Sequence, residues 1–103
     1  MAQERPEKLL EIGVINGMLP ADARLIKVQK SDRLRWRITS NTSGELHLHA
    51  YRISVRLQPG EPGELAFNAF ATGKFRVEWH PDLQPPTGGH AASSLAVLEV
   101  QPH

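Results

Sequence analysis

The chain of 103 residues is the size of a single domain, long enough to bury about 60–65% of the surface of its unfolded form and to fold without a metal ion. Twelve Lys and Arg residues against 11 Asp and Glu residues leave a net charge of +1, which excludes a global field that would recruit nucleic acid or anionic lipid. The absence of cysteine excludes disulfides, thiolate metal sites and a cysteine nucleophile.

The N-terminal segment is polar, and residues 1–8 are predicted to form a disordered tail ahead of a single domain over residues 9–103. This segment does not resemble a signal peptide. It is compatible with a cytosolic protein and with an exported protein whose leader has been left out. No apolar run in the sequence approaches the roughly 20 residues of a membrane span. Membrane insertion is therefore not expected.

Apolar and polar residues alternate through most of the chain, as they do in β-strands. Within residues 33–39, Leu34, Trp36 and Ile38 share one face and three arginines share the other, which predicts a half-buried antiparallel strand. The arginines are expected to form a solvated face paired with glutamates, because exposed aromatic residues for nucleic-acid binding do not accompany them. Similar alternation predicts further strands near residues 10–14, 26–28, 53–57, 65–69, 75–79 and 95–100.

Turn residues separate these strands, in segments that are short and rich in Gly, Pro, Asn or Ser: residues 16–17, 30–32, 41–44, 58–63 and 72–73. About seven short strands and no segment of helical period predict an all-β sandwich. The sequence contains no Ser, His and Asp arrangement, phosphate loop or paired carboxylates typical of hydrolysis or phosphoryl transfer. We therefore do not expect an enzyme of these classes.

Two histidines stand at alternate positions in the segment His47-Leu48-His49, which reads as part of a strand. Alternate strand residues project from one face with Cα atoms about 6.6 Å apart, so both rings can converge on one metal ion. Neutral imidazole is a ligand for copper, zinc, nickel and iron. The alternative is that both are ordinary strand residues.

The phase of the alternation changes shortly after these histidines. In an unbroken strand, His47 and His49 would share the inward face of Ile53, Val55 and Leu57. A bulge or turn near Ala50-Tyr51 would instead reverse the phase. In either case the two histidines are expected to share a face and to lie toward the end of a strand, at one pole of the sandwich.

Two further histidines are candidate ligands. His80 follows a strand in which Phe75, Val77 and Trp79 alternate inward, so its ring points outward unless the strand ends at Trp79. His90 follows Gly88-Gly89 in a long irregular segment and could close over a metal as a fourth ligand.

The order of these segments resembles the cupredoxin-like family, and is most similar to its small, cysteine-poor exported members with an H-x-H-G-Y-type segment. The resemblance covers about residues 10–102. Its most specific parts are His47-x-His49 and Gly73-x-Phe75 followed by His80. It implies a Greek-key β-sandwich of cupredoxin type in an exported, periplasmic or secreted protein.

The sequence departs from the blue copper members of that family. Trp79 stands at about the position of their cysteine ligand, and no methionine follows it in the next loop. A blue copper centre requires a thiolate. What the resemblance implies is therefore the fold and a histidine-only site, and not electron transfer by a copper–thiolate centre.

The sequence is thus interpreted as a copper-binding protein with His47, His49, His80 and His90 as candidate ligands. An all-imidazole site favours Cu(II) over zinc on the affinity order of the divalent metals, with zinc as the alternative. The expected role is to hold or transfer copper, with a protein partner in the transfer. Two alternatives stay open: a metal-free interaction module of the same fold, and a copper oxidase or reductase, which would need a substrate pocket.

Overall fold

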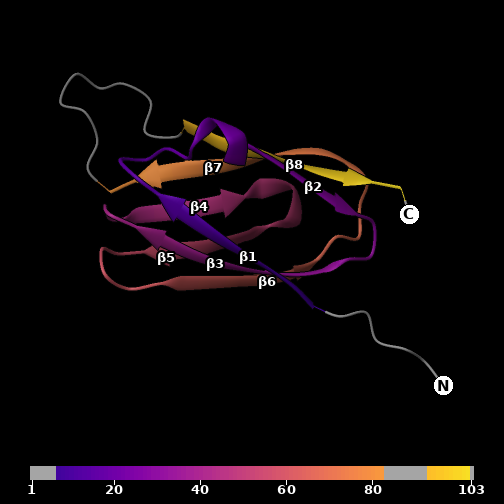
Figure 1. Ribbon diagram of the computed structural model, residues 1–103, viewed down its shortest axis with the longest axis horizontal. Helices are drawn as coiled ribbons and strands as arrows, with labels where there is room; N and C mark the ends of the chain where they lie inside the picture. Colours follow the sequence, from indigo (N-terminus) through magenta and orange to yellow (C-terminus); the bar gives the residue numbers. More distant parts are fainter. Residues whose placement is uncertain (1–6, 83–92, 103) are drawn as a thin grey trace.

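The computed structural model describes residues 7–82 and 93–102. This part of the chain contains eight strands, two single turns of 3₁₀-helix and no α-helix. The predicted all-β sandwich is confirmed, with eight strands in place of about seven because the histidine segment forms a strand of its own. The strands belong to two sheets, and they run roughly along the long axis of the molecule in Figure 1. No helix within the described ranges is long and apolar enough to cross a bilayer.

The smaller sheet has the strand order β1-β3-β6. β1 is parallel to β3, and β3 is antiparallel to β6. Its strands are β1 (Glu7–Val14), β3 (Arg33–Ser40) and β6 (Gly63–Asn68).

The larger sheet has the strand order β2-β8-β7-β4-β5. Only the pairing of β2 with β8 is parallel among its ladders in the described residues. Its strands are β2 (Leu25–Gln29), β4 (Gly44–Leu48), β5 (Ile53–Leu57), β7 (Gly73–Pro81) and β8 (Ser93–Gln101).

The first strand begins inside the segment that was predicted to be a disordered tail, residues 1–8. Glu7 and Lys8 belong to β1, which corrects that boundary by two residues. Two long-range contacts hold them: Arg35 Nε donates to Glu7 Oε1 at 2.8 Å, and Lys8 Nζ donates to the buried Asp32 carboxylate at 3.0 Å. The polar composition of residues 1–8 does not indicate that Glu7 and Lys8 have partners elsewhere in the chain. Residues 1–6 lie outside the described part.

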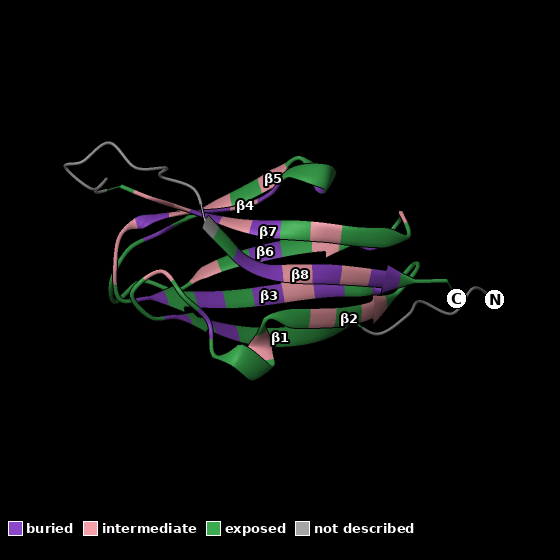
Figure 2. Ribbon diagram, turned by 90° about the horizontal axis from the view of Figure 1, so that it is seen from above, coloured by how far each residue is buried: buried purple, intermediate pink, exposed green. Residues whose placement is uncertain are grey.

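The core lies between the two sheets, where the alternating apolar residues of the sequence meet. Figure 2 shows buried residues alternating with more exposed ones along β3, and buried residues alternating with half-buried ones in the second half of β8. Trp36 is fully buried and packs edge-on against Phe67 at a centroid separation of 5.0 Å. The remaining large, fully buried side chains come from both sheets: Ile38, Leu46, Leu48, Leu57, Leu95, Leu98 and Trp79.

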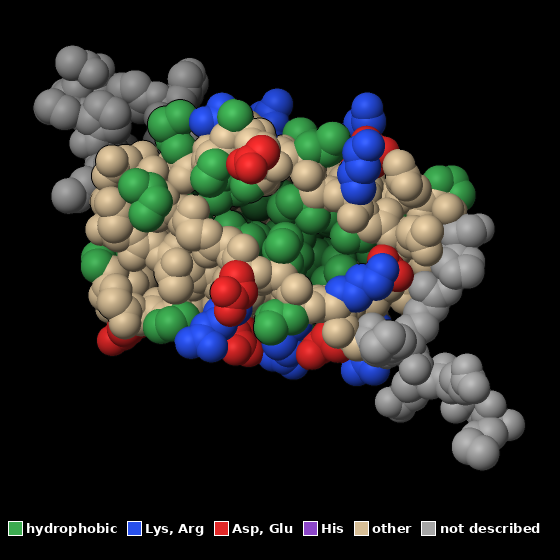
Figure 3. Space-filling view, in the orientation of Figure 1, with side chains coloured by type: hydrophobic (Ala, Val, Ile, Leu, Met, Phe, Trp, Pro, Cys, Tyr) green, Lys and Arg blue, Asp and Glu red, His purple; other side chains and the backbone are tan. Residues whose placement is uncertain are grey.

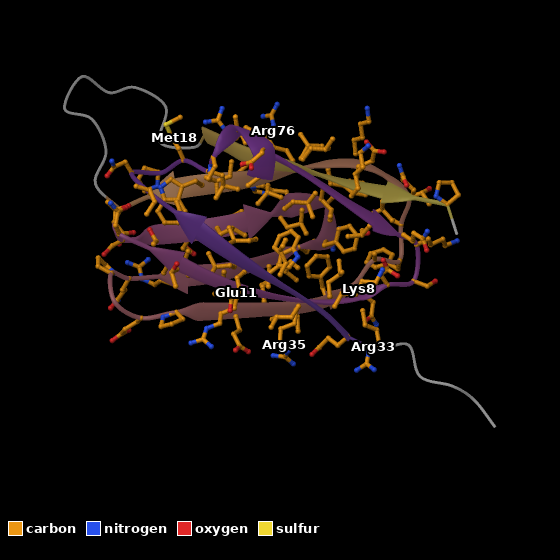
Figure 4. The ribbon with its side chains drawn as sticks, viewed as in Figure 1. Lys8, Glu11, Met18, Arg33, Arg35 and Arg76 are labelled. Carbon is orange, nitrogen blue, oxygen red and sulfur yellow. The ribbon has the colours of Figure 1, made fainter. Side chains whose placement is uncertain are left out.

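The arginines of β3 lie on the outer face of the smaller sheet, as predicted. Figure 4 shows Arg33 and Arg35 pointing away from the sandwich. Arg35 donates to Glu7 at 2.8 Å and to Glu64 at 2.7 Å, so it bridges both neighbouring strands. The pKa of Glu7 is lowered, chiefly by the hydrogen bond from Arg35. This part of the face is a set of paired surface charges, which contribute little to stability individually.

The sandwich is open on the side where β1 and β2 form the sheet edges. Figure 3 shows hydrophobic side chains at the bottom of a hollow between these strands. The hollow is lined by residues of both edges and of the loop that joins them, among them Leu10, Ile12, Leu19, Ala23 and Ile26.

Gly44, at the start of β4, allows β4 and β7 to lie close together. A Cβ atom there would be 2.6 Å from a ring carbon of Trp79 and 2.7 Å from the backbone oxygen of His80. Gly44→Ala must push the two strands apart, and we expect it to lower the free energy of unfolding by about 1–3 kcal/mol in a urea titration.

Gly13 provides the control for this substitution. It also lies in a strand, and its nearest neighbour to a new Cβ is Thr39 Oγ1 at 3.8 Å. Gly13→Ala should leave the midpoint unchanged or slightly raised. Equal midpoints for the parent and Gly44→Ala would contradict the close packing described here.

Candidate metal centre

The pairing of β4 with β7 brings histidines and glutamates together on the outer face of the larger sheet. His47 lies opposite Glu78, and Glu45 lies opposite His80. Directly opposed residues of antiparallel strands point to the same face. The residues that alternate with these four are buried in the core: Leu46, Leu48, Val77 and Trp79.

The second histidine is positioned by a turn. β4 ends at Leu48, and His49–Tyr51 forms a single 3₁₀ turn that closes with Arg52 in the left-handed conformation, at φ 55°. This turn reverses the phase between β4 and β5, so the predicted turn near Ala50-Tyr51 is confirmed and the unbroken inward-facing strand is wrong. The turn returns the ring of His49 to within 5.2 Å of the ring of His47.

Three imidazoles form one cluster. The centroid distances are 4.2 Å for His47 and His80, 5.2 Å for His47 and His49, and 6.0 Å for His49 and His80. One ring nitrogen from each residue can be chosen so that all three lie within 4.8 Å of one another. Metal–nitrogen bonds of about 2.0–2.1 Å place ligand nitrogens roughly 3–4 Å apart, so small side-chain rotations suffice for all three to bind one ion.

A carboxylate lies inside this cluster. Glu78 Oε1 is 2.9 Å from His49 Nε2 and 3.2 Å from His80 Nε2. Partial burial acts to raise the pKa of Glu78, but the hydrogen bond from His80 and the positive charges of His49 and His80 together lower this pKa below its ordinary value. Glu78 is therefore a charged carboxylate held directly between two imidazoles.

The second glutamate is placed differently. Glu45 Oε2 is 3.7 Å from His47 Nε2, beyond hydrogen-bond distance. Its side chain is 38% exposed, against 20% for Glu78. The cluster is thus asymmetric, with one carboxylate engaged and one at its margin.

The cluster is open to solvent. The side chains of His47 and His80 are 26% and 33% exposed, and that of His49 is 60% exposed. A metal ion can therefore reach the three rings without opening the core.

A β-bulge lies beside the cluster. Val77 is opposite Ala96 but Glu78 is opposite Ser94, so Leu95 is an extra residue in β8. Such bulges change the local twist and direction of side chains, and they occur frequently beside functional sites. Leu95 and Ala96 are consecutive buried residues, which an uninterrupted strand with one solvated face would not contain.

The structure brings together three of the four predicted ligands. His47, His49 and His80 meet, while His90 lies outside the described residues. The expectation that His80 would have to turn inward was wrong, because β7 continues to Pro81 and the outward face is the face of His47. The histidines lie near the end of β4, but their side chains are on the outside of a sheet rather than at a pole between the sheets.

Sequence reasoning missed Glu78. It stands two residues before His80 in the same strand, the same spacing that linked His47 to His49. The rule that singled out the histidines could therefore also have placed Glu78 beside His80.

Met18, a thioether near the first turn, is 56% exposed and belongs to the Ile15–Met18 bridge.

Comparison with known proteins finds similarity in structure but not in sequence. No family model and no curated protein matches the chain. A structure described as a copper binding protein in the apo form superposes with a TM-score of 0.69 at 14% identity, over 97% of this chain and 93% of that one. Auracyanin A, a blue copper protein from Chloroflexus aurantiacus, gives 0.62 at 15% identity, over 93% and 100%.

A third similar structure is larger. A chain of a heme-copper terminal oxidase dimer gives a TM-score of 0.67 at 19% identity, over 91% of this chain. The present chain spans only 65% of the length of that protein. At these identities the similarity shows the fold alone, which is a β-sandwich of the cupredoxin-like type that the sequence predicted.

Proposed function

We propose that the protein binds one copper ion, as Cu(II), through His47, His49 and His80. The observation that carries the proposal is the convergence of three imidazole nitrogens within 4.8 Å on the outer face of the larger sheet. Imidazole binds Cu(II) more tightly than zinc in the general affinity order of divalent metals, and zinc is the alternative ion. The similarity to proteins described as copper proteins supports the choice of copper.

The proposed role is to hold or transfer copper outside the cytoplasm, in the periplasm or as a secreted protein, and not to catalyse a reaction. The site contains no thiolate because the chain contains no cysteine, so it cannot form a blue copper centre. The exposure of His49, at 60%, supports exchange of the ion with a partner protein. A similar structure is described as the periplasmic domain of a cytochrome oxidase subunit, which supports the location.

Titration with Cu(II), followed by electron paramagnetic resonance and visible absorption, tests the proposal. One equivalent should bind and give a signal with nitrogen hyperfine structure and only weak colour, because no sulfur is present for an intense charge-transfer band. A strong absorption near 600 nm would contradict a histidine-only site. Failure to bind would favour the metal-free interaction module, in which Glu78 satisfies the histidines by hydrogen bonds alone.

The affinity for Cu(II) should depend strongly on pH. Copper binds neutral imidazole, and free histidine side chains take up a proton near about pH 6.5, so protons compete for up to three rings as the pH falls. Because the pKa of Glu78 is lowered, its carboxylate stays charged through this range and the loss comes from the rings. Competition titrations should show the affinity falling steeply below roughly pH 6. An affinity that is constant between about pH 5 and 8 would mean that the imidazoles are not ligands.

A further inference from the structure

We infer that Glu78 is the fourth copper ligand and that it makes the site selective for Cu(II) over Cu(I). This inference rests on the proposed function, because it concerns the same ion. The sequence-based candidate for a fourth ligand, His90, lies outside the described residues.

The distances around Glu78 are those between neighbouring ligands of one metal ion. Two ligand atoms at about 2.0–2.1 Å from a metal are about 2.9 Å apart at a right angle and about 3.3 Å apart at the tetrahedral angle. Glu78 Oε1 lies 2.9 Å from His49 Nε2 and 3.2 Å from His80 Nε2. An ion bound by these two nitrogens therefore has this oxygen within reach without any change in the backbone.

Glu78 also has the right position relative to the third imidazole. It is directly opposite His47 in the pairing of β4 with β7, and opposed residues have Cβ atoms about 4.5–5.5 Å apart. The carboxylate thus reaches the cluster from the strand beside His47, and His80 reaches it from the next outward position of the same strand. The β-bulge in β8 shifts the register between β7 and β8, and this shift falls between Val77 and Glu78.

The chemistry of the carboxylate leads to the selectivity. Sulfur ligands favour Cu(I), whereas a charged oxygen ligand stabilises the divalent ion more than the monovalent one. With three imidazoles and one carboxylate, the donor set contains no soft ligand. The two oxidation states should therefore differ in how much they depend on Glu78.

Glu78→Gln tests this inference, because the amide keeps the shape of the side chain and removes its charge. Its affinity for Cu(II), measured by competition titration, should fall at least about tenfold, and its affinity for Cu(I) should change less than about threefold. The copper hyperfine splitting of the Cu(II) signal should change, while pulsed measurements still detect three imidazole nitrogens. Circular dichroism and thermal melting establish that the variant is folded.

Glu45→Gln is the matched control. Glu45 is on the same face, but its carboxylate is 3.7 Å from the nearest imidazole nitrogen of His47. This variant removes the same charge from the same surface and should bind both oxidation states within about threefold of the parent. Equal losses in the two variants would show that only the local field matters, and would overturn the inference.

Two other outcomes are informative. If Glu78→Gln loses affinity equally for both oxidation states with an unchanged spectrum, Glu78 only orients the rings through hydrogen bonds, and the inference is overturned while the proposed function stands. If the parent binds no Cu(II), or if His47→Ala binds it as well as the parent, the proposed function itself is wrong.

Discussion

Replacing His47, His49 or His80 by alanine should weaken Cu(II) binding at least about tenfold in each case, or about 1.4 kcal/mol, without unfolding the protein. Each ring supplies one nitrogen to the cluster, and each is at least 26% exposed, so its removal leaves no cavity in the core. Isothermal titration and competition with a chelator measure the affinity. The apo variants should melt within about 2–4 °C of the parent.

His103→Ala provides the control, since the C-terminal histidine is not expected to bind and its removal should change nothing. If the variants at His47 and His49 bind copper like the parent, the ion binds elsewhere. If they unfold the apo protein, the histidines are structural residues, and the metal-free interaction module is the better interpretation.

Trp79→Ala should have the opposite effect, with a large loss of stability and an unchanged site. Trp79 lies between Glu78 and His80 in the sequence, but its side chain is on the other face of β7, where it is 2% exposed. Truncating a buried tryptophan costs about 3–5 kcal/mol, a large share of the stability of a typical domain. Urea titration of the apo protein measures this loss.

Copper titration at low temperature, where the variant is folded, should give an affinity within about threefold of the parent. If Trp79→Ala leaves too little folded protein, Trp79→Phe allows the same comparison with a smaller cavity. A variant that keeps its stability but loses copper would mean that the indole belongs to the site. That result would contradict the assignment of Trp79 to the core.

Much of the fold could be predicted because residue alternation in strands depends only on local geometry. β3 is the clearest case: Leu34, Trp36 and Ile38 alternate with three arginines, and the structure buries the first set. The break between β4 and β5 was predicted only as one of two alternatives, because the sequence His49-Ala50-Tyr51-Arg52 contains no Gly or Pro to mark a turn. The bulge at Leu95 was not predicted, since an extra residue in a ladder depends on the partner strand.

The site could be predicted only in part for the same reason. The proximity of His47 and His49 follows from their spacing along the chain, but the meeting of His47 with His80 depends on the register of β4 against β7. As long as that register was unknown, the outward direction of the His80 side chain argued against His80 as a metal ligand. The register shows that the outward side chains of His80 and Glu78 lie on the same face as His47 and next to it.

Because the cluster lies on the outside of the larger sheet, the residues of β4 and β7 that form the core are separate from those that form the cluster. Substitutions at the inward positions alter folding, whereas substitutions at His47, Glu78 and His80 alter the proposed ligand set and leave the core intact. A sequence could therefore gain, lose or exchange its metal in a few steps, each starting from a folded protein. If the proposed site binds copper, relatives of this chain could share its whole architecture and bind a different ion or none, and identity over the core residues would not reveal which.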